Sequence, residues 1–287
     1  MSTVSVLIAV YAKDDPELFR DSLRSNVLDQ TDMPDQLVVV VDGPVGDAIN
    51  NVLEDARIAF DACRGPDFMT VLRLPKNRGV AAAMNRGIPS CRCELIARAD
   101  ADDISYPDRF RLQKAVLAEH PDVDVVTAWQ HDFSLDEKKI VAVNQCPEYS
   151  EQINALLQLR NPVCQPSMMI RAKVFRLHGT YDETVPLLED YELHLRWTSQ
   201  GVRYRCIQEP LVRVSVSSAL YQRRGGLAYA RREFAFRMNA VKRGLLSGGP
   251  RFYLVATLYL LFRSVPAGVR RRLYVLVRAR ANEEVVL

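Results

Sequence analysis

Two short runs of almost entirely apolar, β-branched residues constrain the fold of this 287-residue chain more than any other feature. They cover residues 4–11 (VSVLIAVY) and 37–41 (LVVVV), and such runs are typical of central strands buried on both faces of a parallel sheet. Between them, Asp15-Pro16 predicts the start of a helix, and apolar residues recur at helical spacing up to Val27. The order strand, helix, strand predicts an α/β fold with a mostly parallel sheet flanked by helices.

The same alternation continues along the first hundred residues. We expect a helix over residues 45–62, a strand over 70–74, an alanine-rich helix from Gly79 through Asn85, and a strand over 95–98. The second half is less regular. It predicts strands over 122–128 and 162–170, a helix from Glu189-Asp190 to Gly201, and helical structure after Gly226.

Polar residues follow three of the predicted strands at the point where each strand ends. They are Asp42, Asn77 and the cluster Asp100-Ala101-Asp102-Asp103. In a doubly wound sheet such positions line one crevice at the carboxyl ends of the strands, which is where these folds bind ligands. Three strand ends with polar groups indicate a site more strongly than one.

The cluster at 100–103 contains three carboxylates within four residues, which repel one another unless a positive charge lies among them. Mg²⁺ accepts one or two protein carboxylates and fills its other sites with substrate phosphates. The cluster therefore predicts a metal–diphosphate site. Taken alone, an Asp-x-Asp pair is more often a solvated acidic turn.

The net charge of +3 is too small to imply nucleic acid as a partner. The six cysteines lack the paired spacing of a zinc site, and no signal peptide is evident, so we expect reduced thiols in a cytoplasmic protein. The charge is unevenly distributed, because fourteen Lys and Arg residues but only one acid lie between Tyr221 and Asn282.

We expect two regions: a catalytic domain over residues 1–220 and a basic, amphipathic helical region over 221–287. Aromatic and aliphatic residues alternate with cationic flanks between Pro250 and Pro266, a segment too short to span a bilayer. This composition predicts a helix lying in the lipid headgroup region, at the anionic inner face of the plasma membrane. The alternative is a helix pair packed on the core or on a second subunit.

Several of these motifs occur together and in order. They are VSVLIAVY, the VVDGP turn, Asn77-x-Gly79, Asn85-x-Gly87, DADDIS-x-PDRF, and LEDYELHLR followed by RRGG. Over nearly its whole length the chain resembles family 2 glycosyltransferases of the GT-A fold, and especially the bacterial enzymes of exopolysaccharide, capsule or O-antigen synthesis. The resemblance implies transfer of a sugar from a nucleotide-sugar donor, UDP-linked, to a saccharide acceptor linked to polyprenyl diphosphate.

The resemblance also implies roles for single residues. Asp190 would be the general base, and Asp100 and Asp102 would hold Mg²⁺ or Mn²⁺, with Asp102 the more direct ligand. Glu189 and Gln165 would lie on the acceptor side. Nucleotide-sugar contacts would come from Ala9, Val10, Tyr11, Asp42, Arg78, Asn85, Asp100, Ala101, Arg223 and Arg224.

The implied chemistry suits these residue types. A divalent metal neutralises the departing diphosphate, and a carboxylate on the far side removes the proton of the attacking hydroxyl. By analogy with glycosidases, such an attack inverts the anomeric centre in one displacement. Gln165 departs from the family, since many relatives have a titratable His in this segment.

Other interpretations remain open at this level. On local sequence alone, Glu189 and Asp190 are better explained as caps of a helix N-terminus, and only the resemblance favours catalysis. Asp42 could be a turn former before Gly43. A nucleotidyltransferase would also use carboxylates and a metal, but it would have a glycine-rich loop where this chain has Tyr11-Ala12-Lys13-Asp14. A catalytically inactive relative that binds glycan or membrane as an assembly factor is the second alternative.

Overall fold

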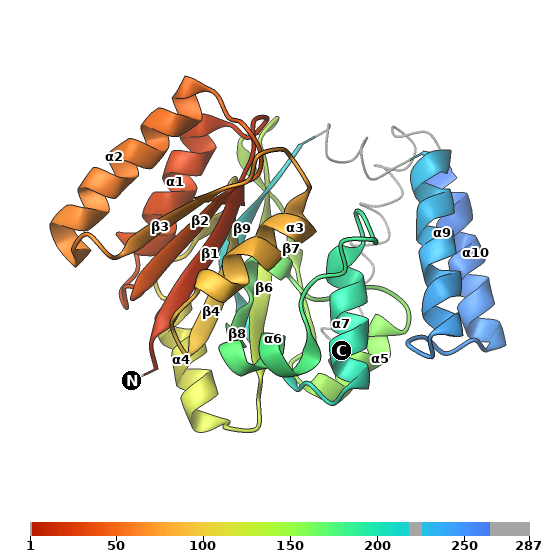
Figure 1. Cartoon of the computed structure of the whole chain (residues 1–287). Helices are drawn as coiled ribbons and strands as arrows, with labels where there is room; N and C mark the ends of the chain where they lie inside the picture. Colours follow the sequence, from red (N-terminus) through yellow and green to blue (C-terminus); the bar gives the residue numbers. More distant parts are fainter. Residues whose placement is uncertain (1, 218–225, 265–287) are drawn as a thin grey trace. The chain divides into compact units, whose positions relative to one another are not determined.

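The structure, a computed structural model, describes residues 2–217 and 226–264 (Figure 1). Its internal contacts divide the chain into residues 1–215 and residues 216–287. The first unit is a mixed α/β structure whose single sheet has nine strands, so the predicted fold class is confirmed. The strands are β1 (Val4–Val10), β2 (Gln36–Val41), β3 (Met69–Arg73), β4 (Leu95–Asp100), β5 (Ile104–Ser105), β6 (Val125–Ser134), β7 (Lys139–Asn144), β8 (Met169–Arg171) and β9 (Tyr204–Val216).

The helices of this unit alternate with its strands, most regularly in the first half. They are α1 (Pro16–Val27), α2 (Asp47–Arg64), α3 (Val80–Gly87), α4 (Arg109–Glu119), α5 (Ser150–Leu157), α6 (Ala172–His178) and α7 (Glu189–Ser199), with short 3₁₀ helices η1 (Ile88–Ser90) and η2 (Gln165–Ser167). The predicted start of α1 at Asp15-Pro16 is confirmed, and the Asp15 carboxylate caps the helix by accepting hydrogen bonds from the backbone N–H groups of Glu17 and Leu18.

The sheet has the strand order β3-β2-β1-β4-β8-β6-β9-β5, and β7 pairs with β6. The first four strands are parallel to one another, as the β-branched runs predict. The strand β8 runs antiparallel to both β4 and β6, and β5 runs antiparallel to β9. The sheet is therefore parallel on the side built from the N-terminal third of the chain and antiparallel on the other.

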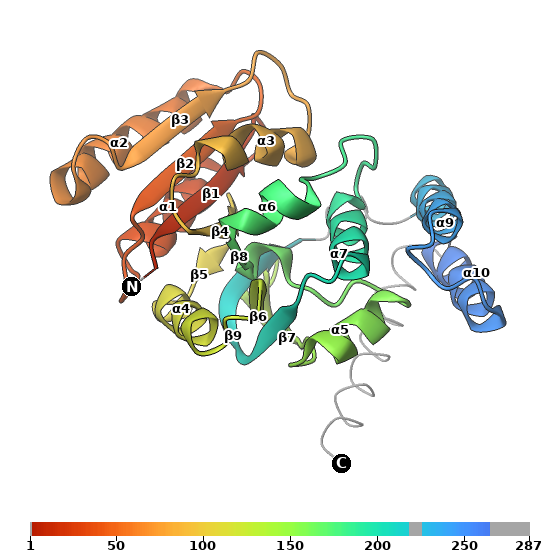
Figure 2. The ribbon, with the colours of Figure 1, turned by 60° about the horizontal axis from the view of Figure 1, so that its bottom comes forward.

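Helices cover both faces of the parallel strands, which explains why β1 and β2 are almost wholly apolar and buried. On one face, Val6 and Ile8 of β1 pack in a core with Phe19 of α1 and Val52 of α2. On the other face lies α3 (Figure 2), so close that a Cβ added to Gly87 would be 2.3 Å from the Leu7 side chain. Only glycine permits this approach of helix to strand.

The predicted strand over residues 162–170 is wrong. The structure has η2 there, followed by the three-residue β8. Pro162 and Pro166 explain the difference, since neither has a backbone N–H to donate to a sheet ladder. The strand predicted over 122–128 begins later and continues to Ser134 as β6, and the antiparallel strands β5, β7 and β9 were not predicted.

The second unit contains two helices, α9 (Leu227–Lys242) and α10 (Pro250–Ser264). In α9, the buried Glu233 and Arg237 form an ion pair of 3.0 Å one turn apart. On α10, the side chains of Tyr253, Leu254 and Leu258 are at least half exposed. Within residues 2–217 and 226–264, no helix combines the length and apolar character needed to cross a bilayer.

Candidate active site

The site lies where the strand order of the parallel strands reverses. The strands β2 and β3 follow β1 in one direction across the sheet, whereas the next strand, β4, lies on the other side of β1. Ligands bind at the carboxyl ends of the strands on either side of such a reversal. Ala9 of β1 is paired with Asp100 of β4, so the predicted nucleotide residues of the first strand and the acidic cluster meet at this edge.

The three carboxylates of the acidic cluster have different surroundings. Asp100 is half-buried and forms an ion pair with the buried guanidinium of Arg98, two residues earlier on β4. Asp102 is half-buried, and its backbone carbonyl accepts a hydrogen bond from the Ser215 hydroxyl. Asp103 is 5% exposed and accepts a 2.8 Å hydrogen bond from the backbone N–H of Ser215. The end of β9 therefore holds the acidic turn in place through two hydrogen bonds from Ser215.

Charge is concentrated at this turn. Burial, reinforced by the nearby carboxylates of Asp102 and Asp100, holds the pKa of Asp103 well above its usual range. For Arg98, burial acts to lower the pKa of the guanidinium, but the charge and hydrogen bond of the Asp100 carboxylate, together with Tyr181 and Asp103, outweigh it and the pKa is raised. An additional cation at this turn would relieve the remaining repulsion among the carboxylates.

Arg109 braces the acidic cluster from inside the protein. Its guanidinium, fully buried, donates hydrogen bonds to the Ser105 hydroxyl at 2.8 Å and to the carbonyl oxygens of Arg98 at 2.7 Å and Met168 at 3.2 Å. Burial lowers its pKa to about 9. Arg109 thus ties β4, β5 and the residue after η2 together directly beneath the turn.

The residues of the turn fit a divalent cation that binds together with substrate. Among the residues that the structure describes, no three His, Cys, Asp or Glu side chains are arranged to hold a metal by themselves. Asp100 and Asp102, the predicted ligands, would be the protein's share of such a site. Such a pair is the protein share expected for Mg²⁺ or Mn²⁺ when diphosphate oxygens complete the coordination.

Asp42 lies at the end of β2 and is 5% exposed. One carboxylate oxygen accepts a 2.7 Å hydrogen bond from the N–H of Arg78, and the other accepts 2.8 Å from the N–H of Gly79. Asp42 therefore holds the loop after β3 in place, in addition to being the predicted nucleotide contact. The turn-former interpretation is too narrow, because the carboxylate reaches a loop 36 residues away in the sequence.

Arg78 and Asn85, the other predicted nucleotide residues in this region, converge on one side chain that was not predicted. The Glu183 carboxylate forms a 2.8 Å ion pair with Arg78 and accepts a 3.1 Å hydrogen bond from Asn85. Asn85 also exchanges two hydrogen bonds with the backbone of Tyr181. The loop before α3 and α3 itself are thereby attached to the segment that precedes α7.

Asp190, the predicted base, is half-buried in the first turn of α7. Its carboxylate accepts a 2.7 Å hydrogen bond from the N–H of Tyr191 and one of 3.2 Å from the Asn161 side chain. A carboxylate has about four lone-pair positions, so these two bonds leave acceptor capacity. The predicted position at a helix N-terminus is confirmed, and it is compatible with a role as base. Glu189 is half-buried beside it.

Gln165 and His194 belong to a hydrogen-bonded chain of four side chains behind Asp190. The Gln165 amide donates 2.7 Å to the Tyr181 hydroxyl and accepts from His194 Nε2 at 3.0 Å, and His194 Nδ1 lies 2.9 Å from the Tyr204 hydroxyl. Burial lowers the pKa of His194 to about 3, so the imidazole is neutral. We call these four residues the Tyr181 chain.

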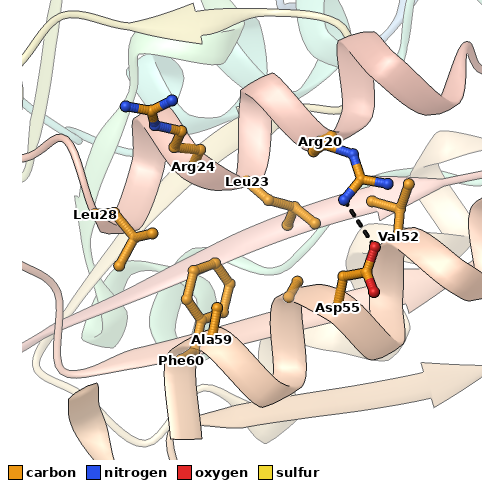
Figure 3. Close-up of a pocket in the computed structure, with 9 residues that line it drawn as sticks. Arg20, Leu23, Arg24, Leu28, Val52, Asp55, Ala59 and Phe60 are labelled. Atoms are coloured by element: carbon orange, nitrogen blue, oxygen red, sulfur yellow. Dashed lines mark hydrogen bonds and ion pairs between the residues drawn. The ribbon is translucent and has the colours of Figure 1, made fainter. Parts of the chain in front are cut away.

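The predicted phosphate contacts Arg223 and Arg224 fall outside the described residues. A depression of about 260 Å³ between α1 and α2 is lined mainly by apolar side chains and crossed by the Arg20–Asp55 ion pair of 2.8 Å (Figure 3). None of the predicted site residues lines it.

Sequence reasoning missed Arg98, Glu183 and Tyr181. Arg98 had a detectable signal, because an arginine inside an apolar strand two residues before an Asp requires a charged partner. Glu183 and Tyr181 had no such signal. The partners of Glu183 lie about 100 residues away in the sequence, and the partner of the Tyr181 hydroxyl is brought to it only by the packing of α7.

Comparison with known proteins agrees with this geometry. Residues 5–178 match the sequence profile described as Glycosyl transferase family 2. The chain is 31% identical over 79% of its length, and 78% of the other protein's, to the UDP-Gal:alpha-D-GlcNAc-diphosphoundecaprenol beta-1,3-galactosyltransferase of Escherichia coli. It is 29% identical over 94% of its length, and 97% of the other protein's, to the amylovoran biosynthesis glycosyltransferase AmsE of Erwinia amylovora.

Solved structures share the fold. A structure of TarS from S. aureus superposes with a TM-score of 0.60, and this chain covers 40% of it. The structure of TarS residues 1–349 with UDP superposes with a TM-score of 0.59, and this chain covers 66% of it. In each case 83% of this chain is matched, at 16% and 17% identity, respectively. The profile match covers more than half of the sequence, and with it the nucleotidyltransferase interpretation gives way: the chain belongs to glycosyl transferase family 2 and is a glycosyltransferase.

Proposed function

We propose that this glycosyltransferase moves a sugar from a UDP-linked donor to a saccharide acceptor on polyprenyl diphosphate, with a divalent metal and with inversion at the anomeric carbon. The proposal extends to synthesis of a bacterial surface polysaccharide. The printed names of two relatives support it, since one denotes a UDP-Gal-dependent transferase acting on a diphosphoundecaprenol-linked sugar and the other an amylovoran biosynthesis enzyme. A TarS structure in complex with UDP-GlcNAc supports the class of donor.

One observation carries the proposal: a single short segment, residues 161–168, contacts both the end of β4 and the start of α7. The backbone N–H of Arg98 on β4 donates 2.9 Å to the carbonyl of Met168, and the side chain of Asn161 donates to Asp190. The acidic turn and the proposed base therefore border the same region. This is the arrangement expected when a leaving group departs on one side of a sugar and a hydroxyl attacks from the other.

In the proposed reaction Asp190 accepts the proton of the acceptor hydroxyl as that oxygen attacks the anomeric carbon. Asn161 and the N–H of Tyr191 fix the orientation of its carboxylate. Asp100 and Asp102 would hold the metal, which when bound neutralises charge on the departing diphosphate. Attack from the face opposite the leaving group converts an α-linked donor into a β-linked product.

The function is tested by measuring nucleotide release and sugar transfer with UDP-galactose and UDP-N-acetylglucosamine in the presence of Mg²⁺ or Mn²⁺. Asp190→Asn keeps the size of the side chain but removes the base. We expect a loss of kcat of at least about 100-fold, with donor affinity unchanged, because general-base catalysis contributes on that order.

Asp55→Asn is the matched control, since its carboxylate forms a surface ion pair with Arg20 on a different part of the molecule. It should retain wild-type kcat. Normal turnover by Asp190→Asn would remove Asp190 from the mechanism, and absence of turnover by the unmodified enzyme with every nucleotide sugar would contradict the proposed function.

A further inference from the structure

The Tyr181 chain has a defined direction. A neutral imidazole has one N–H and one lone pair, and the Gln165 amide oxygen can only accept, so His194 Nε2 is the donor of that pair. His194 Nδ1 is then the acceptor, and the Tyr204 hydroxyl must donate to it. At the other end, the Gln165 amide nitrogen donates to the Tyr181 oxygen. Each proton in the chain therefore points toward Tyr181.

The consequence is that no member of the Tyr181 chain accepts the proton of the Tyr181 hydroxyl. Its oxygen already accepts from Gln165, and among the residues that the structure describes it has no acceptor for its own proton. The side chain is 6% exposed. A buried hydroxyl with an unused proton is costly unless a ligand accepts the hydrogen bond.

Packing around α7 puts this hydroxyl beside the proposed reaction space. Asp190 and His194 are four residues apart, on one face of α7. Asn161 contacts the first and Gln165 the second, so the 161–165 segment follows that face. Tyr181 is bonded to Gln165 through its hydroxyl and to Asn85 of α3 through its backbone. Burial raises the pKa of Tyr181, the Arg98 guanidinium acts to lower it, and the charges of Asp190, Asp100 and Glu189 raise it further, which is consistent with a location between the base and the acidic turn.

The backbone around Tyr181 is held rigidly enough to aim the hydroxyl. The guanidinium of Arg196 donates to the carbonyl oxygens of His178 and Thr180, and the Trp197 indole donates 3.0 Å to that of Gly179. Asn85 fixes the backbone of Tyr181 itself. A preorganised donor of this kind loses little entropy when a ligand binds.

We propose that the Tyr181 hydroxyl donates a hydrogen bond to a hydroxyl group of the donor sugar, and that Gln165, His194 and Tyr204 act as positioning residues that fix the direction of this bond. The inference rests on the proposed function, since it concerns the sugar of the same donor. A sugar hydroxyl is the suitable partner because Tyr181 offers one neutral, directed proton, whereas the diphosphate would be bound by charged groups. Tyr181 is thus a determinant of sugar specificity.

The test uses the full-length enzyme with whichever of UDP-galactose and UDP-N-acetylglucosamine it turns over. In Tyr181→Phe the ring remains and only the hydroxyl is removed. We expect kcat/KM for the donor to fall about fivefold to tenfold, the loss of one hydrogen bond. Affinity for UDP, which has no sugar, should stay within about twofold. A merely structural role would lower both together.

Tyr106→Phe is the matched control, because its hydroxyl bonds His131 Nδ1 at 2.7 Å and is not part of the Tyr181 chain. It should leave donor kcat/KM within about twofold of the wild-type value. Gln165→Met removes the hydrogen bond that positions the Tyr181 hydroxyl, and it should also lower donor kcat/KM. The double variant Tyr181→Phe/Gln165→Met should be no slower than Tyr181→Phe alone, since Gln165 acts through Tyr181.

A second measurement needs no variant of Tyr181. With monodeoxy analogues of the donor, the unmodified enzyme should lose about fivefold to tenfold in kcat/KM for one of them, and Gln165→Met should lose most of that preference. Full activity of Tyr181→Phe, parallel loss of UDP affinity, or equal use of every deoxy donor would each overturn the inference. None of these results would contradict the proposed function. Absence of turnover with every nucleotide sugar would contradict both the proposed function and this inference.

Discussion

Most carboxylates around the site already accept hydrogen bonds within the chain. Asp42 accepts two backbone N–H groups, Asp103 accepts that of Ser215, and Asp190 accepts one backbone and one amide donor. Such bonds fix the position of a carboxylate without using all of its lone pairs. A structural contact at a candidate residue therefore does not argue against binding or catalysis. Single substitutions distinguish a structural role from a role in binding or catalysis, because a substitution can remove the charge of a carboxylate while keeping its shape.

Asp102→Asn tests the proposed metal site. The amide is nearly isosteric but uncharged and is a weaker ligand for a hard cation. We expect UDP affinity in the presence of Mg²⁺ or Mn²⁺ to fall at least about tenfold, while the weaker affinity in the presence of a chelator stays unchanged. Isothermal titration calorimetry provides both values. If metal strengthens UDP binding equally in the two proteins, Asp102 is not a ligand.

His194 predicts a pH dependence of stability. Its pKa is about 3 in the folded protein, against 6.5 for the free side chain. The unfolded chain therefore binds more protons between these values, so His194 favours the folded state above pH 6.5 and this contribution is lost as the pH falls toward 3. One pKa unit corresponds to about 1.4 kcal/mol, so about 2 kcal/mol should be lost between pH 7 and pH 5.

Urea unfolding at several pH values measures this effect. His194→Gln cannot titrate in this range, so its free energy of unfolding should be less steep with pH than that of the wild type, although it will be lower at pH 7. Equal slopes for the two proteins would show that another group causes the acid sensitivity.

At the scale of elements, the loop after β2 and the loop after β3 are fitted to one another. Asp42 bonds the backbone of the second loop, and Gly43 lies directly against it. A Cβ added to Gly43 would be 2.4 Å from the backbone nitrogen of Asn77. Gly43 also has a φ of 88°, which L side chains rarely adopt. The position of Arg78 relative to the strand ends thus depends on a residue with no side chain.

Gly43→Ala should therefore lower the free energy of unfolding by about 1–3 kcal/mol and reduce UDP affinity, because both the backbone angle and the contact with Asn77 are strained. Gly46→Ala is the matched control, three residues later. A Cβ at Gly46 meets nothing within 4 Å, and its φ is −75°. Denaturant unfolding and calorimetry should show a change below about 1 kcal/mol for the control.

The helix α7 organises the other side of the site. Its first turn contains Asp190, its middle contains His194, and its last turn contains Arg196 and Trp197, which hold the carbonyl groups of the loop before Tyr181. One helix thus positions the proposed base and the loop of the proposed sugar contact. A shift of α7 would move both together.

At the scale of the whole molecule, the two units differ in their surfaces. In the unit of residues 216–287, α10 exposes Tyr253, Leu254 and Leu258 within two turns, and the sequence around it is strongly basic. We propose that this unit associates with an anionic membrane surface, where exposed apolar side chains enter the headgroup region and each nearby cation contributes about 1 kcal/mol. A polyprenyl-linked acceptor would be located at such a surface.

Replacing both Leu254 and Leu258 with Glu should lower co-sedimentation with vesicles containing phosphatidylserine at least about tenfold, because apolar area is lost and like charges are introduced. Leu177→Glu is the control, since Leu177 is 71% exposed on α6 of the first unit. It should bind vesicles as the wild type does. Binding of the double variant at wild-type strength would show that α10 does not contact the membrane.

The sequence determined the parts of the protein that depend on neighbours along the chain. Periodicity predicted the four parallel strands and the helices between them, the polar residues after the strands predicted the edge of the candidate site, and the resemblance to the family proposed a role for each residue. These features follow from local burial patterns and short motifs. The antiparallel half was harder to predict from the sequence, because its strands are paired by long-range contacts. In residues 162–170, prolines replace the expected strand with a 3₁₀ turn.

Only the tertiary structure decided which side chains meet. The contacts of Glu183 with Arg78 and Asn85, of Arg109 with the backbone beneath the acidic turn, and of Tyr181 with Gln165 join segments that the sequence separates by 11 to 105 residues. A hydrogen bond across such a distance depends on how helices pack on the sheet, and no local pattern encodes it. The direction of the Tyr181 proton is a property of that packing alone.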